Sequence, residues 1–301
     1  MNGTSLDQRR HAISPYRWLG RAAVVAIIGF FILFFVVPII WLVIASGKSP
    51  RDLITTAPFH TGTFSALADN WTALVDFQHG VIFTWLGNSA LYSIGALALT
   101  LLTSIPAGYA LALGDFRGRK ALLTTTLIVM LIPNTALVLP IFLELSAVHL
   151  IGTPLSVILP FSFFPFGVYL TYIYFSTSIP RDLLAAARID GCGELAVFGR
   201  IALPLATPVV ALVGFFSFVA NWNNYFLPFL TVPGAKAPIQ VGLAEMLSNV
   251  PAFNPTAAGT TSIQLPALAL ATLVSVAPVM LVFLFSQRFL VSGLTAGGTK
   301  E

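Results

Sequence analysis

The sequence has a single cysteine, Cys192, and few charged residues. One cysteine excludes a disulfide within the chain and a metal site built from several cysteines. The four histidines, at positions 11, 60, 79 and 149, are far apart and show no ligand spacing. Charged residues make up 9% of the 301 positions, against about 25% in a typical soluble domain. The composition therefore indicates neither a metal centre nor an ordinary soluble domain.

Long apolar runs are what the sequence does contain, because 57% of its residues are hydrophobic. A membrane-crossing helix needs roughly 20 apolar residues. Six segments qualify, and none contains Asp, Glu, Lys or Arg: residues 24–45, 86–111, 122–142, 154–175, 209–230 and 263–285. The first run lacks a small-residue cleavage site and is interpreted as a retained span. We therefore predict an all-α polytopic membrane protein with six transmembrane helices.

The basic residues predict the orientation of these spans. Twelve of the fifteen Lys and Arg residues lie in the two terminal segments and in the connections after the second and fourth spans. The remaining three are Lys48, Arg51 and Lys236. Basic residues concentrate on the cytoplasmic side of membrane proteins, so both termini are predicted to be cytoplasmic. This gives a cytoplasmic segment 1–23, a six-span domain 24–286 and a cytoplasmic tail 287–301.

The connection between the fourth and fifth spans, residues 178–208, is a long polar interruption in the second half of the chain. Residues 181–189 and 194–202 have helical patterns, and Asp190-Gly191 between them favours a sharp turn, because glycine accepts left-handed backbone angles. We predict a cytoplasmic helix–turn–helix with one apolar face. The pattern alone leaves two interpretations open: contact with another protein, or an amphipathic segment resting on lipid.

The spans hold polar but uncharged residues that suit an uncharged solute. Asn134 lies in the third span, and an amide- and aromatic-rich run lies in the fifth: Asn221, Trp222, Asn223, Asn224 and Tyr225. Amide hydrogen bonds and aromatic rings can bind sugars, but the same residues also join membrane helices. Both roles remain open. The lack of ionisable residues argues against a proton- or sodium-coupled carrier.

The connection 178–208 resembles the cytoplasmic loop of binding-protein-dependent ABC transporter permeases. In that family the loop reads Glu-Ala-Ala, two residues, Asp-Gly-Ala, five residues, Phe, two residues, Ile, one residue, Leu-Pro, three residues, Pro. This sequence matches at Ala186, Ala187, Asp190, Gly191, Phe198, Ile201, Leu203, Pro204 and Pro208. The run Asn221-Trp222-Asn223 and the C-terminal residues 287–298 resemble the maltose-type, carbohydrate-importing branch.

The resemblance implies a permease subunit of an ATP-driven importer in a prokaryotic inner membrane, moving a di- or oligosaccharide. It implies four kinds of partner: a second, non-identical permease, two ATPase subunits, an extracytoplasmic solute-binding protein and membrane lipid, with no nucleic acid. ATP and Mg would be bound by the ATPase subunits and no cofactor by this chain. The docking residues implied are Ala186, Ala187, Asp190, Gly191, Phe198, Leu203 and Pro204.

Two positions depart from the family pattern. The family's Glu is Ala185 here, and the third residue of Asp-Gly-Ala is Cys192. The loss of the Glu removes an expected ion pair with the ATPase. Asp182, nearly one helical turn earlier, is our candidate replacement.

The alternatives are a related permease for another solute such as glycerol phosphate, a stand-alone secondary carrier or channel, and a membrane enzyme. Enzyme sites near a membrane usually need clustered His, Asp or Glu, and the sequence has no such cluster and no catalytic residue that we can name. A phosphate-binding loop needs Gly, four residues and Gly-Lys-Ser/Thr. Gly47-Lys48-Ser49 lacks the first glycine, so no ATPase site is expected in this chain.

Overall fold

The computed structural model describes residues 15–256 and 262–295, and their regular structure is helical throughout, with no strand in these ranges. The α-helices are α1 (Pro15–Ser46), α2 (Pro50–Thr55), α3 (Phe64–Asp76), α4 (Val81–Leu113), α5 (Arg119–Met130), α6 (Val138–Ala147), α7 (Leu155–Ser162), α8 (Pro165–Thr177), α9 (Arg181–Ile189), α10 (Glu194–Val197), α11 (Leu203–Leu205), α12 (Thr207–Trp222), α13 (Phe226–Thr231), α14 (Ile239–Ser248) and α15 (Leu265–Thr295). Short 3₁₀ turns η1 (Phe77–His79), η2 (Asn134–Leu137) and η4 (Gly234–Lys236) and a π-helix η3 (Phe198–Ala202) complete them.

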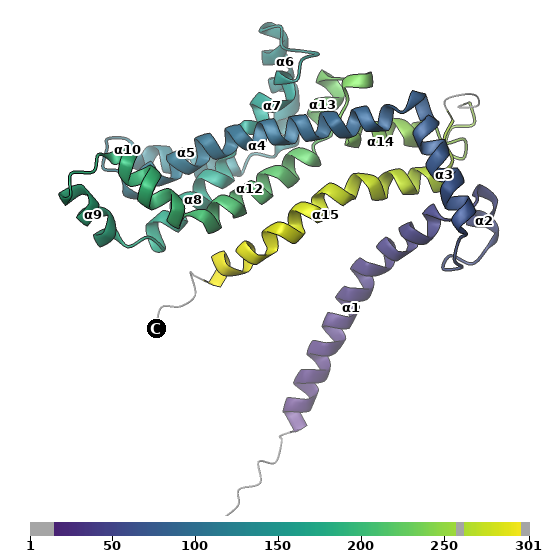
Figure 1. Ribbon diagram of the computed structural model, residues 1–301, viewed down its shortest axis with the longest axis horizontal. Coiled ribbons are helices and arrows are strands. Elements are labelled where there is room, and N and C mark those ends of the chain that lie inside the picture. The colour runs from purple at the N-terminus through teal and green to yellow at the C-terminus, as the bar shows by residue number, and fades with distance from the viewer. Residues whose placement is uncertain (1–14, 257–261, 296–301) are drawn as a thin grey trace, which may run out of the picture.

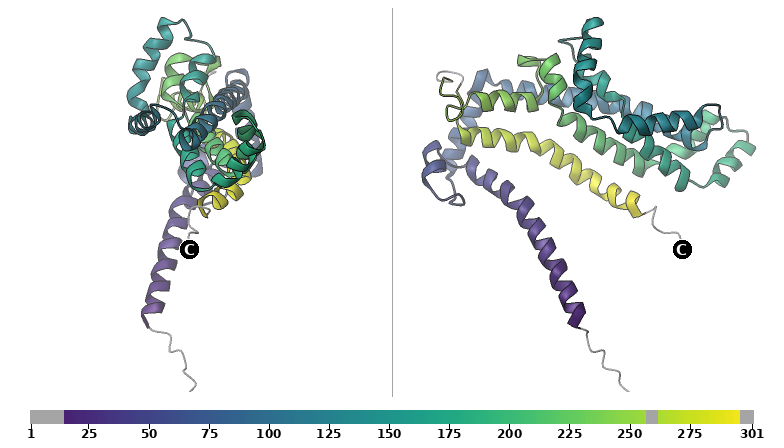
Figure 2. Two further views of the ribbon diagram at one scale, coloured as in Figure 1. Left: turned by 90° about the vertical axis from the view of Figure 1, so that its left-hand side faces the viewer. Right: turned by 180° about the vertical axis from the view of Figure 1, so that it is seen from behind.

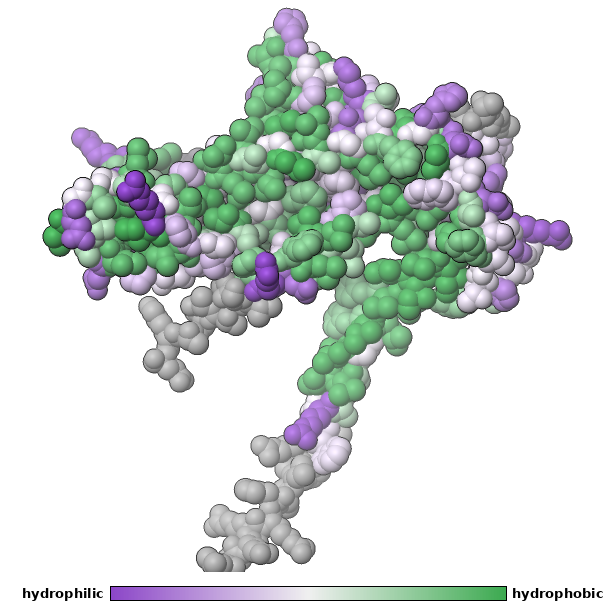
Figure 3. Space-filling view, in the orientation of Figure 1, coloured by the Kyte–Doolittle hydropathy of each residue, from purple (hydrophilic) through white to green (hydrophobic). Residues whose placement is uncertain are grey.

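The helices form an elongated bundle with two different ends. In Figure 1, α9 and α10 lie at one end, and α2, α3 and the start of α15 lie at the other. Helix α1 leaves the bundle near α3 and diverges from α15, as the reverse view in Figure 2 also shows. Most of its apolar side chains are exposed, and the face seen in Figure 3 is largely green, which is typical of a helix surrounded by lipid or by other membrane helices.

The helix lengths support the predicted six spans, with two of them bent. Four segments of the described chain are long and apolar enough to cross a membrane: 20–46, 81–113, 155–177 and 265–289. Two bent pairs raise the count to as many as six: α5 with η2–α6 at 95°, and residues 194–205 with α12 at 77°. In the second pair only α12 overlaps a predicted span, 209–230. The predicted segments 24–45, 86–111 and 263–285 are each one continuous helix, α1, α4 and α15.

The other three predicted spans are interrupted helices, and a continuous helix over each would be wrong. The 122–142 segment breaks after Met130 and the 154–175 segment breaks at Phe163–Phe164, in each case just before a proline. Proline lacks an N–H and forces its predecessor out of the helical region. The 209–230 segment ends its helix at Trp222, where asparagines replace apolar residues. Asparagine favours helix ends because its side chain competes for backbone hydrogen bonds.

Helix α4 is the centre of the bundle because a buried stripe of small residues runs along it. Every fourth residue belongs to this stripe: Ala96, Thr100, Ser104, Gly108 and Ala112, all of them buried. Small residues at this spacing let membrane helices approach closely. A Cβ on Gly108 would lie 2.4 Å from the Cβ of Thr171 on α8, so the two helices touch there backbone to backbone.

Two hydroxyls of the stripe donate hydrogen bonds to backbone carbonyls at the break between α7 and α8. Thr100 Oγ1 donates to the carbonyl of Ser162 at 3.0 Å, and Ser104 Oγ reaches the carbonyl of Phe164 at 3.5 Å. The break before Pro165 leaves the Ser162 carbonyl without a helical partner, whereas the Phe164 carbonyl also accepts from the N–H of Val168 in α8 at 3.2 Å. Inside a membrane each unsatisfied backbone group is costly, so α4 makes the break between α7 and α8 tolerable.

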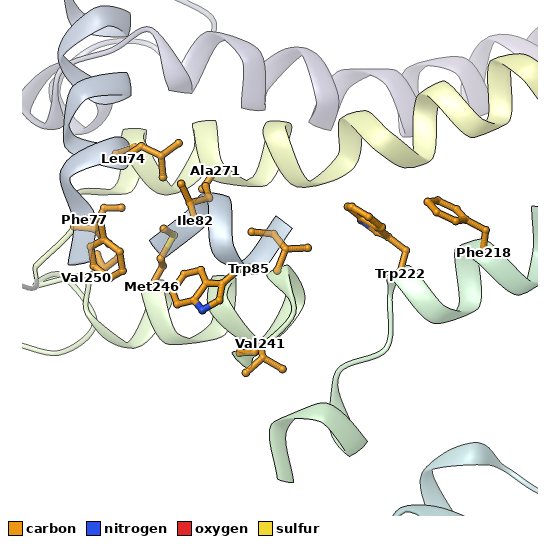
Figure 4. Packing of buried hydrophobic residues seen from close by; sticks show 14 residues of the cluster. Leu74, Phe77, Ile82, Trp85, Phe218, Trp222, Val241, Met246, Val250 and Ala271 are labelled. Atoms are coloured by element: carbon orange, nitrogen blue, oxygen red, sulfur yellow. The ribbon is translucent and has the colours of Figure 1, made fainter. Parts of the chain in front are cut away.

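Near its first turns α4 also holds the segment that follows α13. Trp85 Nε1 donates to Gly234 O, Tyr92 Oη donates to Lys236 O, and Asn88 Nδ2 donates to Ala235 O and Ala237 O at 2.8 and 3.0 Å. Figure 4 shows Trp85 within the hydrophobic cluster of this end, with Met246 and Val250 nearby. Asn88 is therefore occupied by structural hydrogen bonds.

The contact between α4 and α8 predicts the outcome of one substitution. Gly108→Ala places a methyl group into Thr171, and relieving such overpacking costs about 1–3 kcal/mol. We expect a thermal midpoint several degrees lower for the purified protein. Gly87→Ala is the matched control, because Gly87 is on the same helix and its Cβ would meet no atom within 4 Å. Equal midpoints for the two variants would contradict this packing.

Candidate functional site

The 178–208 segment folds as predicted into two short helices joined by a glycine turn, and we call residues 181–205 the coupling block. Gly191 has φ +85°, the left-handed region. The N–H of Gly191 bonds the carbonyl of Arg188, and the N–H of Cys192 bonds the carbonyl of Ala187, at 3.1 and 3.0 Å. This pair of bonds is a Schellman cap, in which glycine supplies the left-handed residue and a small apolar residue follows it. Cys192 is therefore the residue that completes this cap after the left-handed glycine.

An ion pair crosses the glycine turn and joins the two helices of the coupling block. Arg188 Nε and Nη2 lie 2.6 and 3.1 Å from the two carboxylate oxygens of Glu194, a bidentate arrangement. It is the one salt bridge among the described residues. The Arg188 hydrogen bonds lower the pKa of the Glu194 carboxyl, and Glu194 raises the pKa of Arg188. Both side chains are substantially exposed, so the pair orients the helices more than it stabilises them.

The inner face of the coupling block packs against the bundle. Leu184, Ala187 and Val197 are buried in one cluster with Phe175 of α8. The ring of Phe198 lies 4.9 Å from the ring of Tyr109 on α4. Ala187 and Phe198, both implied docking residues, therefore also contact this chain's own bundle, Ala187 as a buried residue and Phe198 as a half-buried one.

The outer face of the coupling block carries two apolar side chains that the sequence reasoning did not select for docking. Ile189 is 86% exposed and Leu195 is 88% exposed. The remaining candidate docking residues are also exposed, namely Asp182, Ala186, Asp190, Gly191, Leu203 and Pro204. The spacing of Leu195 with Phe198 and Ile201 suggested one apolar face, but the chain turns so that only Leu195 points outward. Ile189 next to the Asp-Gly turn was a usable sequence signal.

A cavity of about 620 Å³ lies where three helix breaks meet. The breaks are those between α5 and α6, between α7 and α8, and between α12 and α13. Its lining is Val129, Met130, Ile132, Asn134, Thr135, Leu137, Val138, Ile141, Pro160, Phe161, Phe163, Phe164, Pro165, Phe166, Ala220, Asn221, Asn223, Asn224, Tyr225, Phe226 and Leu227. None of these residues is Asp, Glu, Lys, Arg or His, so the described wall is uncharged, amide-bearing and aromatic.

The fold brings most of the predicted pathway residues together. Asn134 lines the same cavity as Asn221, Asn223, Asn224 and Tyr225, although it lies in a different span. Trp222 does not line it: its ring is 3% exposed, stacks on Phe218 at 5.5 Å and donates to Ser275 O at 3.0 Å. We therefore assign Trp222 to packing. The sequence reasoning missed the phenylalanines at the Pro165 break.

The amides of the cavity differ in how far they are already occupied. Asn221 Nδ2 donates to Ser217 O of its own helix at 2.8 Å, and Asn223 Nδ2 donates to Val219 O at 3.0 Å. Asn224 Nδ2 is buried and has no hydrogen-bond partner among the described residues. A buried amide without a partner is costly, so Asn224 is the side chain best able to bind a polar solute here.

No group of three or more His, Cys, Asp or Glu residues in the described part of the chain lies close enough to hold a metal ion.

Comparison with known proteins decides the family. Residues 104–296 match the model of the binding-protein-dependent transport system inner membrane component family. The chain belongs to this family. It is 33% identical to the arabinooligosaccharides transport system permease protein AraQ of Halalkalibacterium halodurans, over 91% of this chain and 95% of that protein. It is 30% identical to the diacetylchitobiose uptake system permease protein NgcG of Streptomyces coelicolor, over 87% and 83% of the two chains.

A solved structure shares the fold of this permease. It is the crystal structure of a bacterial ABC transporter involved in the import of the acidic polysaccharide alginate. The two chains superpose with a TM-score of 0.79 at 21% identity, over 92% of this chain and 98% of the other. The predicted recognition and all-α fold are confirmed: the chain is an inner-membrane permease subunit, and its relatives are transport proteins, not enzymes.

The lowered pKa of Glu194 predicts how the ion pair responds to pH. A carboxyl whose pKa is lowered on folding contributes stability above its unfolded pKa, near 4.3, and loses it as pH falls through the folded value. Glu194→Gln should therefore be slightly less stable than the parent at pH 7, and the difference should be smaller at an acid pH below about 4.3. Thermal midpoints at both pH values check this, and a difference that grows in acid would contradict it.

Proposed function

We propose that this permease forms half of the membrane channel of an ABC importer for an uncharged di- or oligosaccharide. The importer comprises this chain, a second, non-identical permease, two ATPase subunits that bind ATP and Mg, and an extracytoplasmic protein that delivers the sugar. Both termini of this chain lie in the cytoplasm, on the side of the coupling block. The names of the relatives, which include arabinooligosaccharide and diacetylchitobiose systems, support the substrate class.

The uncharged cavity is the observation that carries the substrate proposal. Sugars offer many hydroxyls that both donate and accept hydrogen bonds, and they have apolar ring faces that stack on aromatic side chains. The cavity presents Asn134, Asn224 and Tyr225 beside several phenylalanines, and its described wall holds no charge. An anionic solute such as glycerol phosphate would find no cationic partner in this wall, which favours a neutral sugar.

The exposed face of the coupling block supports the proposed docking on an ATPase. Ile189 and Leu195 are 86% and 88% exposed, and Asp182 and Asp190 on the same block are exposed as well, so this end of the molecule offers apolar and acidic side chains to a cleft on a partner. Arg188–Glu194 and the Schellman cap make the coupling block rigid, so movement of the ATPase would displace it as a unit.

Docking predicts a loss of ATPase binding when the apolar tip is made polar. Leu195→Asp should reduce co-purification of the ATPase at least about tenfold, because a desolvated charge opposes burial in the cleft. Ile54→Asp is the control, since Ile54 is 80% exposed on α2 at the opposite end. Normal ATPase recovery with Leu195→Asp would reject this surface as the docking site. A charge-reversal exchange between Asp182 and the facing ATPase residue tests Asp182, and absence of rescue would reject that role.

A substitution at Gly191 distinguishes docking on the ATPase from coupling of ATP hydrolysis to transport, because this residue has a left-handed backbone conformation. A β-branched side chain is strained at φ +85°, although no atom lies within 4 Å of its Cβ position. We expect Gly191→Val to assemble with the ATPase but to uncouple ATP hydrolysis from transport. Solute uptake and ATP hydrolysis are measured together in proteoliposomes. Fully coupled transport by this variant would contradict the proposed role of the turn.

The cavity predicts which amide determines apparent affinity for the sugar. Asn224→Ala should raise the apparent KM for the transported sugar roughly tenfold, the effect of one lost hydrogen bond in a desolvated site. Asn221→Ala is the comparison within the cavity, because its amide already donates to its own helix. Initial uptake rates over a sugar concentration series give both values. An unchanged KM for Asn224→Ala would assign the amide to packing and remove the main support for a sugar site here.

A further inference from the structure

Tyr109 lies where the bundle meets the coupling block. Its ring is 5.2 Å from the ring of Phe175 on α8 and 4.9 Å from the ring of Phe198 in the coupling block. It follows Gly108, at which α4 touches α8 backbone to backbone. One side chain of α4 therefore contacts both its neighbouring span and the segment at the end of the bundle.

The hydroxyl of Tyr109 is in an unusual position. It is buried and has no hydrogen-bond partner within bonding distance among the described residues. It nevertheless lies beside the Arg188–Glu194 pair, close enough for electrostatic interaction with both side chains. Hydrogen bonds to ionised groups are the strong ones, and a buried hydroxyl without a partner is costly. A small shift of the coupling block would thus turn this approach of the hydroxyl to the ion pair into a charge-assisted hydrogen bond.

We propose that Tyr109 is a positioning residue through which movement of the coupling block reaches α4. In one of the two conformations between which the transporter alternates, its hydroxyl is hydrogen-bonded to the Arg188–Glu194 pair. The inference rests on the proposed docking of the coupling block on an ATPase. From Tyr109 the movement has a rigid route along α4, because Thr100 and Ser104 on the same helix hold the break between α7 and α8 that borders the cavity. Two discrete arrangements of one contact are what mechanical coupling requires.

The test uses the complete transporter in proteoliposomes, with this chain, its partner permease, the ATPase and the loaded binding protein. Tyr109→Phe keeps both ring contacts and removes only the hydroxyl. We expect it to assemble and to hydrolyse ATP within about twofold of the parent, while solute moved per ATP falls about tenfold. Tyr172→Phe is the matched control, since Tyr172 packs against the same cluster from α8.

A double-mutant comparison separates coupling from a merely structural role. In an Arg188→Gln/Glu194→Gln background, Tyr109→Phe should change the solute-to-ATP ratio by less than about twofold, because its partner is already absent. An additive loss accompanied by a lower thermal midpoint would overturn the proposal in favour of simple packing. So would a parental solute-to-ATP ratio in Tyr109→Phe alone. If the parent chain recruits no ATPase, the proposed function and this inference both fail, whereas a coupled parent with an unaffected variant rejects the inference only.

Discussion

The structure depends on one constraint, the need to satisfy backbone hydrogen bonds inside a membrane while keeping helices broken. Interrupted spans open the cavity, but each interruption frees carbonyl and N–H groups that lipid cannot satisfy. Helix α4 solves this locally. Its small side chains at every fourth position let neighbouring helices approach, and Thr100 and Ser104 supply hydroxyls to the carbonyls of Ser162 and Phe164. The same stripe of small residues on α4 therefore allows both the close packing of the core and the helix breaks that form the cavity.

Composition and periodicity predicted the helical class, the six-span plan and the two helices of the coupling block, since these depend on local sequence, but not that three of the spans are interrupted. They could not predict which side of a short helix faces the bundle. Phe198 and Leu195 look alike in a helical pattern, yet one contacts Tyr109 and the other is exposed. That difference arises from the turn at Gly191 and from a residue in another span, both of which are tertiary facts.

The cavity, too, was predictable from the sequence only in part. The asparagines and prolines that end helices are visible in the sequence, so the breaks at Pro133, Pro165 and Asn223 could be anticipated as weak points. Their convergence could not, because Asn134 and Asn224 meet only through the packing of three separate spans. Trp222 is the reverse case, an aromatic residue of suitable chemistry whose ring the fold directs into the core.

A wall made of helix ends has a consequence for the electric field in the cavity. The ends of α5 and α12 leave carbonyl groups and the start of α8 leaves N–H groups, so the wall carries partial charges of both signs and no net charge. Counter-ions have little to screen there, and passage of the solute should depend weakly on ionic strength. Replacing one amide side chain of this wall by another polar, uncharged side chain alters the hydrogen bonds offered to a solute without creating an unpaired charge. Solute specificity can therefore change through single substitutions.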